Sequence, residues 1–253
     1  MDLTTLPAPA FTLVDGVTQG LAAACYLAIG AGAWLRAPRD IRTRVFLAFS
    51  IANIVVFGLP TAWWLHGTTD PTKLPVAITS AILAGLGVGA LLLFHFTQVF
   101  PRRRPWIKSS GVQMAVAYCL TPLAIAGLVR FAPANAASLT TPYTLAMIVF
   151  GFPLLVLLGI VLPVTAMVSL VRSHREAQQH GLERAKRPLE WILVSQIGGG
   201  TLAIVFAPIL AVVSPNGLTQ AVLTLIIWAL GLLTPLAFAA AVWKYGVLSI
   251  SPD

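Results

Sequence analysis

The stretch "LLLFHFTQVFPRRRPW", Leu91–Trp106, combines an oily run with one histidine, a Phe-Pro pair and three consecutive arginines. The apolar run begins well before it, near residue 74. A membrane helix needs about 20 mostly apolar residues, and arginines directly after such a run are typical of its cytoplasmic flank. The stretch therefore predicts a transmembrane helix that ends at a basic segment.

The composition extends this interpretation to the whole chain. Of the 253 residues, 58% are hydrophobic and only 9% are charged, whereas a soluble domain has about 25% charged residues. The net charge of +8 raises nucleic acid as a partner, but the basic residues lie in short segments between apolar runs, so no nucleic-acid partner is expected. Cys25 and Cys119 lie inside apolar runs and are expected to act as small hydrophobes. The N-terminus has no basic n-region, so no cleaved signal peptide is expected.

Seven apolar runs are long enough to cross a bilayer. With short connections between them, they predict an all-α membrane protein that forms a single bundle of seven transmembrane helices and one domain over residues 1–253. The predicted spans are roughly 11–35, 44–66, 74–100, 109–131, 143–171, 188–213 and 218–243.

The basic residues predict the orientation of these spans. The connections after spans one, three and five, together with Lys244, hold 14 of the 16 Lys and Arg residues, and only Lys73 and Arg130 fall on the other side. Because Lys and Arg mark cytoplasmic loops, the N-terminus is expected outside and the C-terminus in the cytoplasm, in a bacterial inner membrane. The residues expected to set topology and dock a partner are Arg102, Arg103, Arg104, Arg184, Lys186 and Arg187.

Polar residues inside the spans are the candidate functional residues. At 100° per residue, His95 falls near the small residues Gly85 and Gly89, so it is expected to face other helices. It has two interpretations: a neutral ring bonded to a nearby polar group, or a signalling or ligand-binding role. Interhelical or signalling contacts are expected for His95, Gln98, Asn53 and Gln196, and a possible ligand cavity for Asp15, Gln19 and Tyr118, with isolated interhelical hydrogen bonds as the alternative.

Cofactor chemistry finds little support in the sequence. A haem or metal at His95 needs a second ligand, and His66 is predicted at the opposite rim, most of an about 30 Å core away. A retinal chromophore needs a lysine in the middle of the seventh span, and Lys244 lies at its end. With no HExxH or CxxC motif and no paired carboxylates, we expect no cofactor and no enzymatic activity.

Three motifs occur in order along the chain: "LFHFTQVFPRRRPW" (Leu93–Trp106), "LERAKRPLEWILVSQIGGG" (Leu182–Gly200) and "PLAFAAAVWKYGVLSIS" (Pro235–Ser251). Together they resemble the N-terminal seven-helix sensor region of bacterial histidine kinases. The first motif resembles the end of its third helix, the second the start of its sixth helix, and the third its last helix and the exit from it. The resemblance implies a sensor whose last helix passes a signal to a cytoplasmic output module. Because the sequence ends at Asp253 without a phosphoacceptor helix, an ATP-binding domain or a cyclase, the output is expected from a separate partner.

Two functions follow from this pattern. The first is a receptor-like sensor that signals to a cytoplasmic or membrane partner. The alternative is a non-catalytic membrane subunit that anchors or stabilises a larger complex. A small carrier or channel is disfavoured because the chain shows no inverted repeat and no charged pathway.

Overall fold

The computed structural model describes residues 8–65, 76–100, 103–109, 111–130, 141–179, 181, 186–196 and 217–249, and in these residues it contains helices and no strand. The first helices are α1 (Ala8–Arg36), α2 (Ile41–Leu65), α3 (Val76–Val99), the short α4 (Pro105–Ser109) and α5 (Gly111–Arg130). A continuous helical segment over 141–179 and a helix at 186–196 follow. The last helix, α10 (Gly217–Ala239), continues into the π-helical η5 (Ala240–Lys244) and the 3-10 turn η6 (Val247–Ser249).

Five of these helices are long and apolar enough to cross a membrane, so the chain is an all-α, multi-pass membrane protein. They match the first five predicted spans. The described part of the sixth predicted span is the helix at 186–196, and residues 197–213 lie outside the described residues. The seventh predicted span corresponds to α10 and η5. The five spanning stretches are Gly16–Arg36, Ile41–Trp63, Ala77–Val99, Gly111–Val129 and Tyr143–Gln179.

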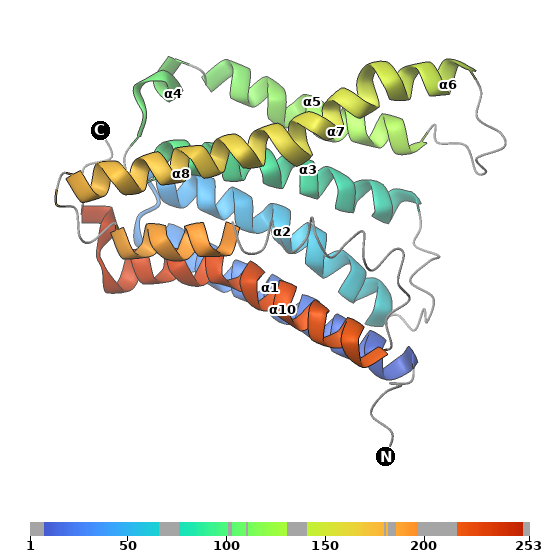
Figure 1. The fold of residues 1–253 in the computed structure, drawn as a ribbon, viewed down its shortest axis with the longest axis horizontal. Coiled ribbons are helices and arrows are strands. Elements are labelled where there is room, and N and C mark those ends of the chain that lie inside the picture. The colour runs from blue at the N-terminus through green and yellow to red at the C-terminus, as the bar shows by residue number, and fades with distance from the viewer. Residues whose placement is uncertain are drawn as a thin grey trace.

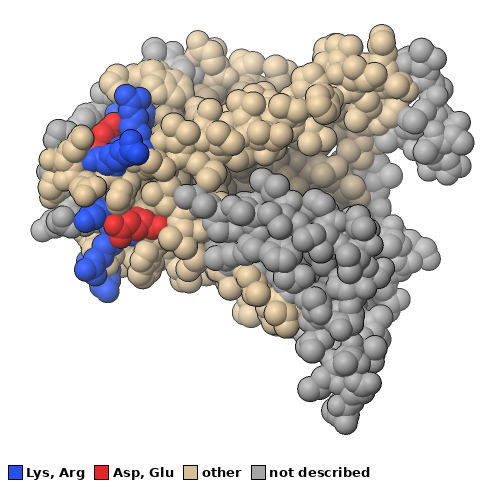
Figure 2. Space-filling model, viewed as in Figure 1, with Lys and Arg blue, Asp and Glu red and all other residues tan. Residues whose placement is uncertain are grey.

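The long helices run side by side along the long axis of the molecule (Figure 1). Helix α1 packs against α2 and α10, α2 against α3, and α3 against α5 and α8. Charged side chains of the described residues gather at one end on the face shown in Figure 2. We call this end the basic end; it contains the start of α2 and the last turns of α1, α3, α8 and α10.

The segment 141–179 alternates between two kinds of helix. It consists of α6 (Thr141–Ala146), the π-helical η3 (Met147–Gly151), α7 (Phe152–Val156), the π-helical η4 (Leu157–Val161) and α8 (Leu162–Gln179). Each π-segment ends two residues before a proline, Pro153 or Pro163. Proline lacks an N–H and its ring clashes with the carbonyl four residues earlier, so a locally wider turn relieves the crowding. Both prolines are thus preceded by a π-helical turn.

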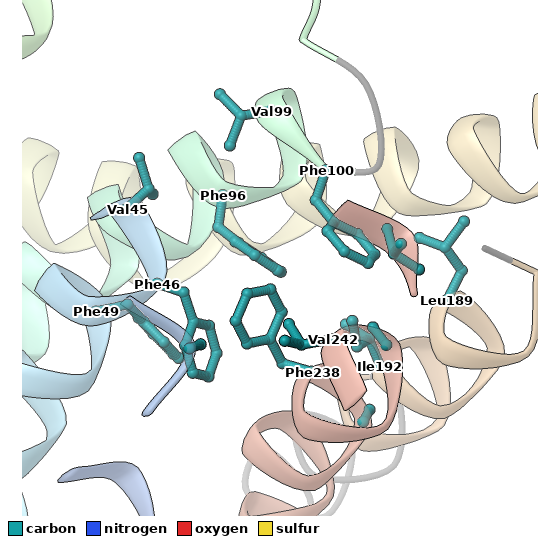
Figure 3. Packing of buried hydrophobic residues seen from close by; sticks show 14 of the residues in the cluster. Val45, Phe46, Phe49, Phe96, Val99, Phe100, Leu189, Ile192, Phe238 and Val242 are labelled. Atoms are coloured by element: carbon teal, nitrogen blue, oxygen red, sulfur yellow. The ribbon is translucent and has the colours of Figure 1, made fainter. Parts of the chain in front are cut away.

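The tightest part of the core is an aromatic cluster at the basic end, formed by Phe46, Phe96, Phe100 and Phe238 (Figure 3). Phe238 from α10 stacks on Phe46 from α2 with ring centroids 3.9 Å apart, and its ring meets Phe96 from α3 at 5.3 Å, edge to face. Such pairs contribute about 0.5–1.5 kcal/mol each beyond the burial of area. The cluster therefore fixes α2, α3 and α10 to one another at this end.

Helices α2 and α3 also approach closely farther along the bundle. A Cβ atom at Gly85 would lie 3.0 Å from Val56 Cγ2 and 3.3 Å from the Ala52 carbonyl oxygen. The small residue thus permits close backbone contact, as small residues do in membrane bundles. By contrast, only 6% of the spanning windows in α5 and Tyr143–Gln179 is buried, against 28% in α1, α2 and α3, so α5 and the segment beside it form the loosely packed side.

Candidate functional site

A buried arginine organises the connection between α1 and α2. Asp40 precedes the first residue of α2, and its Oδ1 accepts the backbone N–H of Arg42 at 2.8 Å, which satisfies one of the free donors at a helix start. The Arg42 side chain is fully buried and forms a bidentate pair with the same carboxylate, with Nη2–Oδ2 at 2.7 Å and Nε–Oδ1 at 3.0 Å. Paired in this way, a charged side chain can be buried at the basic end.

The same guanidinium holds the chain where it leaves the last helix. Arg42 Nη1 donates to the carbonyl oxygen of Val247 at 3.1 Å, and Nη2 donates to that of Leu248 at 3.3 Å. Gly246, just before them, has a φ of 60°, a left-handed conformation that glycine adopts without strain. We call Asp40, Arg42, Val247 and Leu248 the exit clamp, because it bonds the segment after η5 to the α1–α2 connection.

A second set of polar contacts joins the end of α3 to α8. Ser169 Oγ donates to the Thr97 carbonyl at 3.3 Å, and Arg104 Nη2 donates to Ser173 Oγ at 3.3 Å. Arg104 Nη1 also lies 3.9 Å from a carboxylate oxygen of Glu176. Two residues of the predicted basic segment, Arg103 and Arg104, are half-buried, so at least Arg104 has a structural partner in addition to its charge.

His95 and Tyr118 meet between α3 and α5. His95 Nδ1 lies 2.7 Å from Tyr118 Oη, within hydrogen-bond distance, and the two rings are nearly parallel at 21°. The histidine is half-buried and faces a neighbouring helix. The contact pairs a residue expected to make a polar interhelical contact with one expected to line a cavity.

The helix at 186–196 bonds to α10 and α8. Ser195 Oγ and Thr234 Oγ1 are 2.7 Å apart, and Gln196 Nε2 donates to the same Thr234 oxygen at 2.9 Å. At its other end, Glu190 Oε1 lies 3.2 Å from His174 Nε2 of α8. Gln196 thus links this helix to α10.

Other predicted site residues have local partners or lie elsewhere. Asn53 Nδ2 donates to the Phe49 carbonyl at 2.8 Å, and Gln98 Nε2 donates to Thr97 Oγ1 at 3.2 Å. Within the described part of the chain, these two side chains therefore bond inside α2 and α3 and not across helices. Lys186 and Arg187 open the helix at 186–196, whereas Arg102 and Arg184 lie outside the described residues.

Two of the three residues predicted to line a cavity, Gln19 and Tyr118, lie on helices with different packing partners. Gln19 is half-buried on α1, which packs against α2 and α10, whereas Tyr118 lies on α5, which packs against α3. The side chain of Asp15 lies outside the described residues. A pocket of about 470 Å³ does occur, but it lies between α3, α5 and residues 143–159, and its described lining contains neither Gln19 nor Tyr118.

The exit clamp was not singled out from the sequence. A signal was present in the sequence. The stretch "RAPRDIRTR", Arg36–Arg44, has four arginines and a single acid, Asp40. Asp40 lies directly before a helix and two residues before Arg42. The topology argument treats all flanking arginines alike, so it cannot tell a buried one from a solvated one. The long-range partners, two backbone carbonyls more than 200 residues away, leave no pattern of side chains to detect.

In the described residues, no group of three or more His, Cys, Asp or Glu side chains is arranged to hold a metal ion. In comparisons with known proteins, no family model and no curated protein matches the chain. The polar contacts at the basic end and the exit clamp are therefore the features on which a function has to be argued.

Proposed function

We propose that the chain is a membrane sensor that passes a signal, through α10 and the segment after it, to a separate protein partner on the cytoplasmic side. The proposal extends to seven spans with the N-terminus outside and the C-terminus in the cytoplasm of a bacterial inner membrane. The resemblance to the sensor region of histidine kinases and the 14-to-2 division of basic residues support it.

One observation carries the proposal: the exit clamp ties the segment after the last helix to the α1–α2 connection. A guanidinium with no exposed surface cannot exchange its carbonyl partners for water without local opening. A shift of α1 or α2 relative to α10 must therefore move the exit or break these bonds. This is the coupling that a sensor with its output at the C-terminal end requires.

The aromatic cluster adds a second connection to the same place. Phe96 of α3 and Phe100, the residue directly after α3, both contact Phe238 of α10, which lies nine residues before Val247. A movement of α3 would thus displace the end of α10, because the rings between them are rigid and close-packed. The polar contacts of His95 and Arg104 extend this connection to α5 and α8.

The test is photocrosslinking in cells with a photoreactive amino acid at Lys244, which is exposed beside the exit. We expect a crosslink to a second protein, and we expect Arg42→Gln in the same chain to change its yield. Leu145, which is exposed near the other end of the bundle, is the control position. A Lys244 probe that crosslinks only lipid, or the same protein from Leu145 as from Lys244, would contradict the proposal.

Topology has its own readout. A C-terminal fusion to a reporter that is active only in the cytoplasm should be active, and one that requires export should not. The opposite pattern would reverse the orientation and remove the cytoplasmic partner from the proposal.

The burial pattern favours a second candidate function, a subunit that anchors a larger membrane complex. Val112, Phe150 and Phe152 are 77%, 68% and 67% exposed on α5 and the segment after it, which is apolar surface that another protein's helices could cover. A stoichiometric complex that survives purification and shields Phe150 from labelling would favour the subunit over the sensor.

A further inference from the structure

The pocket of about 470 Å³ lies between α3, α5 and the π-helical part of the segment 141–179, on the loosely packed side of the bundle. Glycines contribute to three parts of its wall: Gly87 on α3, Gly151 in η3 and Gly159 in η4. The two π-segments lie along this wall, and such turns recur at functional sites in other proteins. The volume falls in the range of about 300–1,000 Å³ that is typical of ligand pockets.

The lining has almost no hydrogen-bonding capacity. Apart from glycines it consists of Leu, Ile, Val and Met side chains and one tyrosine. That tyrosine, Tyr143, directs its hydroxyl to the Leu128 carbonyl at 3.5 Å. An apolar cavity of this kind excludes water, so its occupant within the membrane must be hydrocarbon.

The size of the pocket indicates whether its occupant is a thin hydrocarbon chain or a helix. A helix with its side chains is about 10 Å across, so 470 Å³ would hold only about one turn of it. The lining on the segment 141–179 extends from Tyr143 to Gly159, which is at most about 24 Å at the α-helical rise of 1.5 Å per residue, because the π-helical turns rise less. Such a wall is longer than one leaflet of hydrocarbon, about 15 Å, and suits a chain that enters from a headgroup layer.

We propose that this pocket binds the acyl chain of a bilayer phospholipid at a defined, saturable site. A phospholipid keeps its charged head in the interface while one chain enters the pocket. A free fatty acid would have to place its carboxylate somewhere, and the described residues of the lining offer no cation and no free hydroxyl to receive it. The inference does not depend on the proposed signalling function, because it rests on the pocket alone.

The chain offers a matched pair of variants for the test. Gly159 lines the pocket, and a Cβ there would meet only Leu155 Cδ2 at 4.0 Å, so Gly159→Leu has room for its Cβ and adds side-chain volume at the pocket wall. Gly127 on α5 is not among the lining residues, and a Cβ there has nothing within 4 Å. Gly127→Leu therefore makes the same substitution in a spanning helix of the same side and leaves the pocket as it is.

The experiment uses the full chain in nanodiscs that contain phosphatidylcholine with a diazirine in one acyl chain, followed by mass spectrometric mapping of the adducts. We expect adducts on the half-buried lining residues Leu128, Leu154 and Leu158 that unlabelled phosphatidylcholine displaces, and we expect Gly159→Leu to lose them while Gly127→Leu retains them. Adducts on Phe150 and Val112 should be unaffected by either variant, which controls for folding and for general lipid contact.

Three results would overturn the proposal. The first is labelling of the lining that unlabelled lipid does not displace, or that both variants reduce alike. The second is displaceable labelling from a diazirine fatty acid but not from the phospholipid, which would assign the pocket to a free amphiphile. The third is self-association of the chain that Gly159→Leu abolishes, which would assign this face to a second copy.

Discussion

The strongest prediction concerns Asp40, because its removal takes away the carboxylate that forms a bidentate pair with a fully buried guanidinium. In the pair, Arg42 is 0% and Asp40 12% exposed. Breaking a buried pair from one side costs about 3–5 kcal/mol. Arg42 keeps its bonds to the Val247 and Leu248 carbonyls, so Asp40→Asn should cost about 3 kcal/mol, at the lower end of that range. Asp40→Ala should cost about 1 kcal/mol more, because it also removes the helix cap.

A more specific test is whether the double variant is more or less stable than Asp40→Asn alone. Removing both charges of a buried pair avoids the uncompensated buried charge that removal of one partner leaves. Asp40→Asn combined with Arg42→Met should therefore unfold at a higher denaturant concentration than Asp40→Asn alone. Glu176→Gln is the control, since that carboxylate is half exposed and its ion pairs should contribute less than about 1 kcal/mol.

Two measurements check these expectations. Unfolding of the purified protein by SDS in mixed micelles gives the free energies. Maleimide reactivity of Leu248→Cys, with Cys25 and Cys119 replaced by alanine, reports release of the exit, and it should rise in Asp40→Asn. If Asp40→Asn stays within about 0.5 kcal/mol of the parent, as an ordinary surface substitution does, and Cys reactivity is unchanged, the exit clamp does not hold the exit.

The remaining predictions concern the two helix contacts beside the clamp. Either His95→Leu or Tyr118→Phe removes the α3–α5 hydrogen bond, so each should cost only about 0.6 kcal/mol of stability and leave membrane insertion intact. Non-additive stability costs in the double variant would verify the contact, and additive costs would refute it. Phe238→Ala empties the centre of the aromatic cluster. It should cost near the lower end of about 3–5 kcal/mol of stability, because lipid hydrocarbon also solvates the Phe238 side chain when the helices of the parent separate. Phe150→Ala, on the exposed face, should change the same SDS unfolding curve little.

The sequence predicts the helices well because hydrophobic length alone decides them in a bilayer. Every backbone polar group must be satisfied within the membrane, so an apolar run of sufficient length has few structures other than a helix. Spans one to five, the close approach at Gly85 and the interhelical position of His95 all follow from that constraint and from helical periodicity. The kinks at Pro153 and Pro163 were predictable as distortions, but not as two π-helical turns.

The functional features depend on which helices become neighbours, and hydropathy does not encode that. Gln19 and Tyr118 both resemble cavity residues in sequence, yet they lie on helices with different packing partners. The apolar pocket was missed for the opposite reason, since its residues look like ordinary lipid-facing positions. Arg42 was missed because its partners are backbone carbonyls at the far end of the chain, which any sequence would supply.

The contacts from α5 to the exit form a continuous path, but a path transmits a change only if an element in it has two arrangements. Tyr118 bonds to His95, and Phe96, the residue after His95, contacts Phe238. The π-helical η5 lies between Phe238 and Val247 of the exit clamp. In η5 the Tyr245 N–H bonds to the Ala240 carbonyl at 3.0 Å, one residue beyond the α-helical partner. An α-helical register would transfer that bond to Ala241 and rotate everything after it, so we expect η5 to be the element that switches. Isotope-edited infrared spectroscopy of the Ala240 carbonyl should then show two bands whose ratio shifts in Asp40→Asn. A single band at the same position in both proteins would mean that η5 is a fixed kink, and that any signal has to leave the bundle by another element.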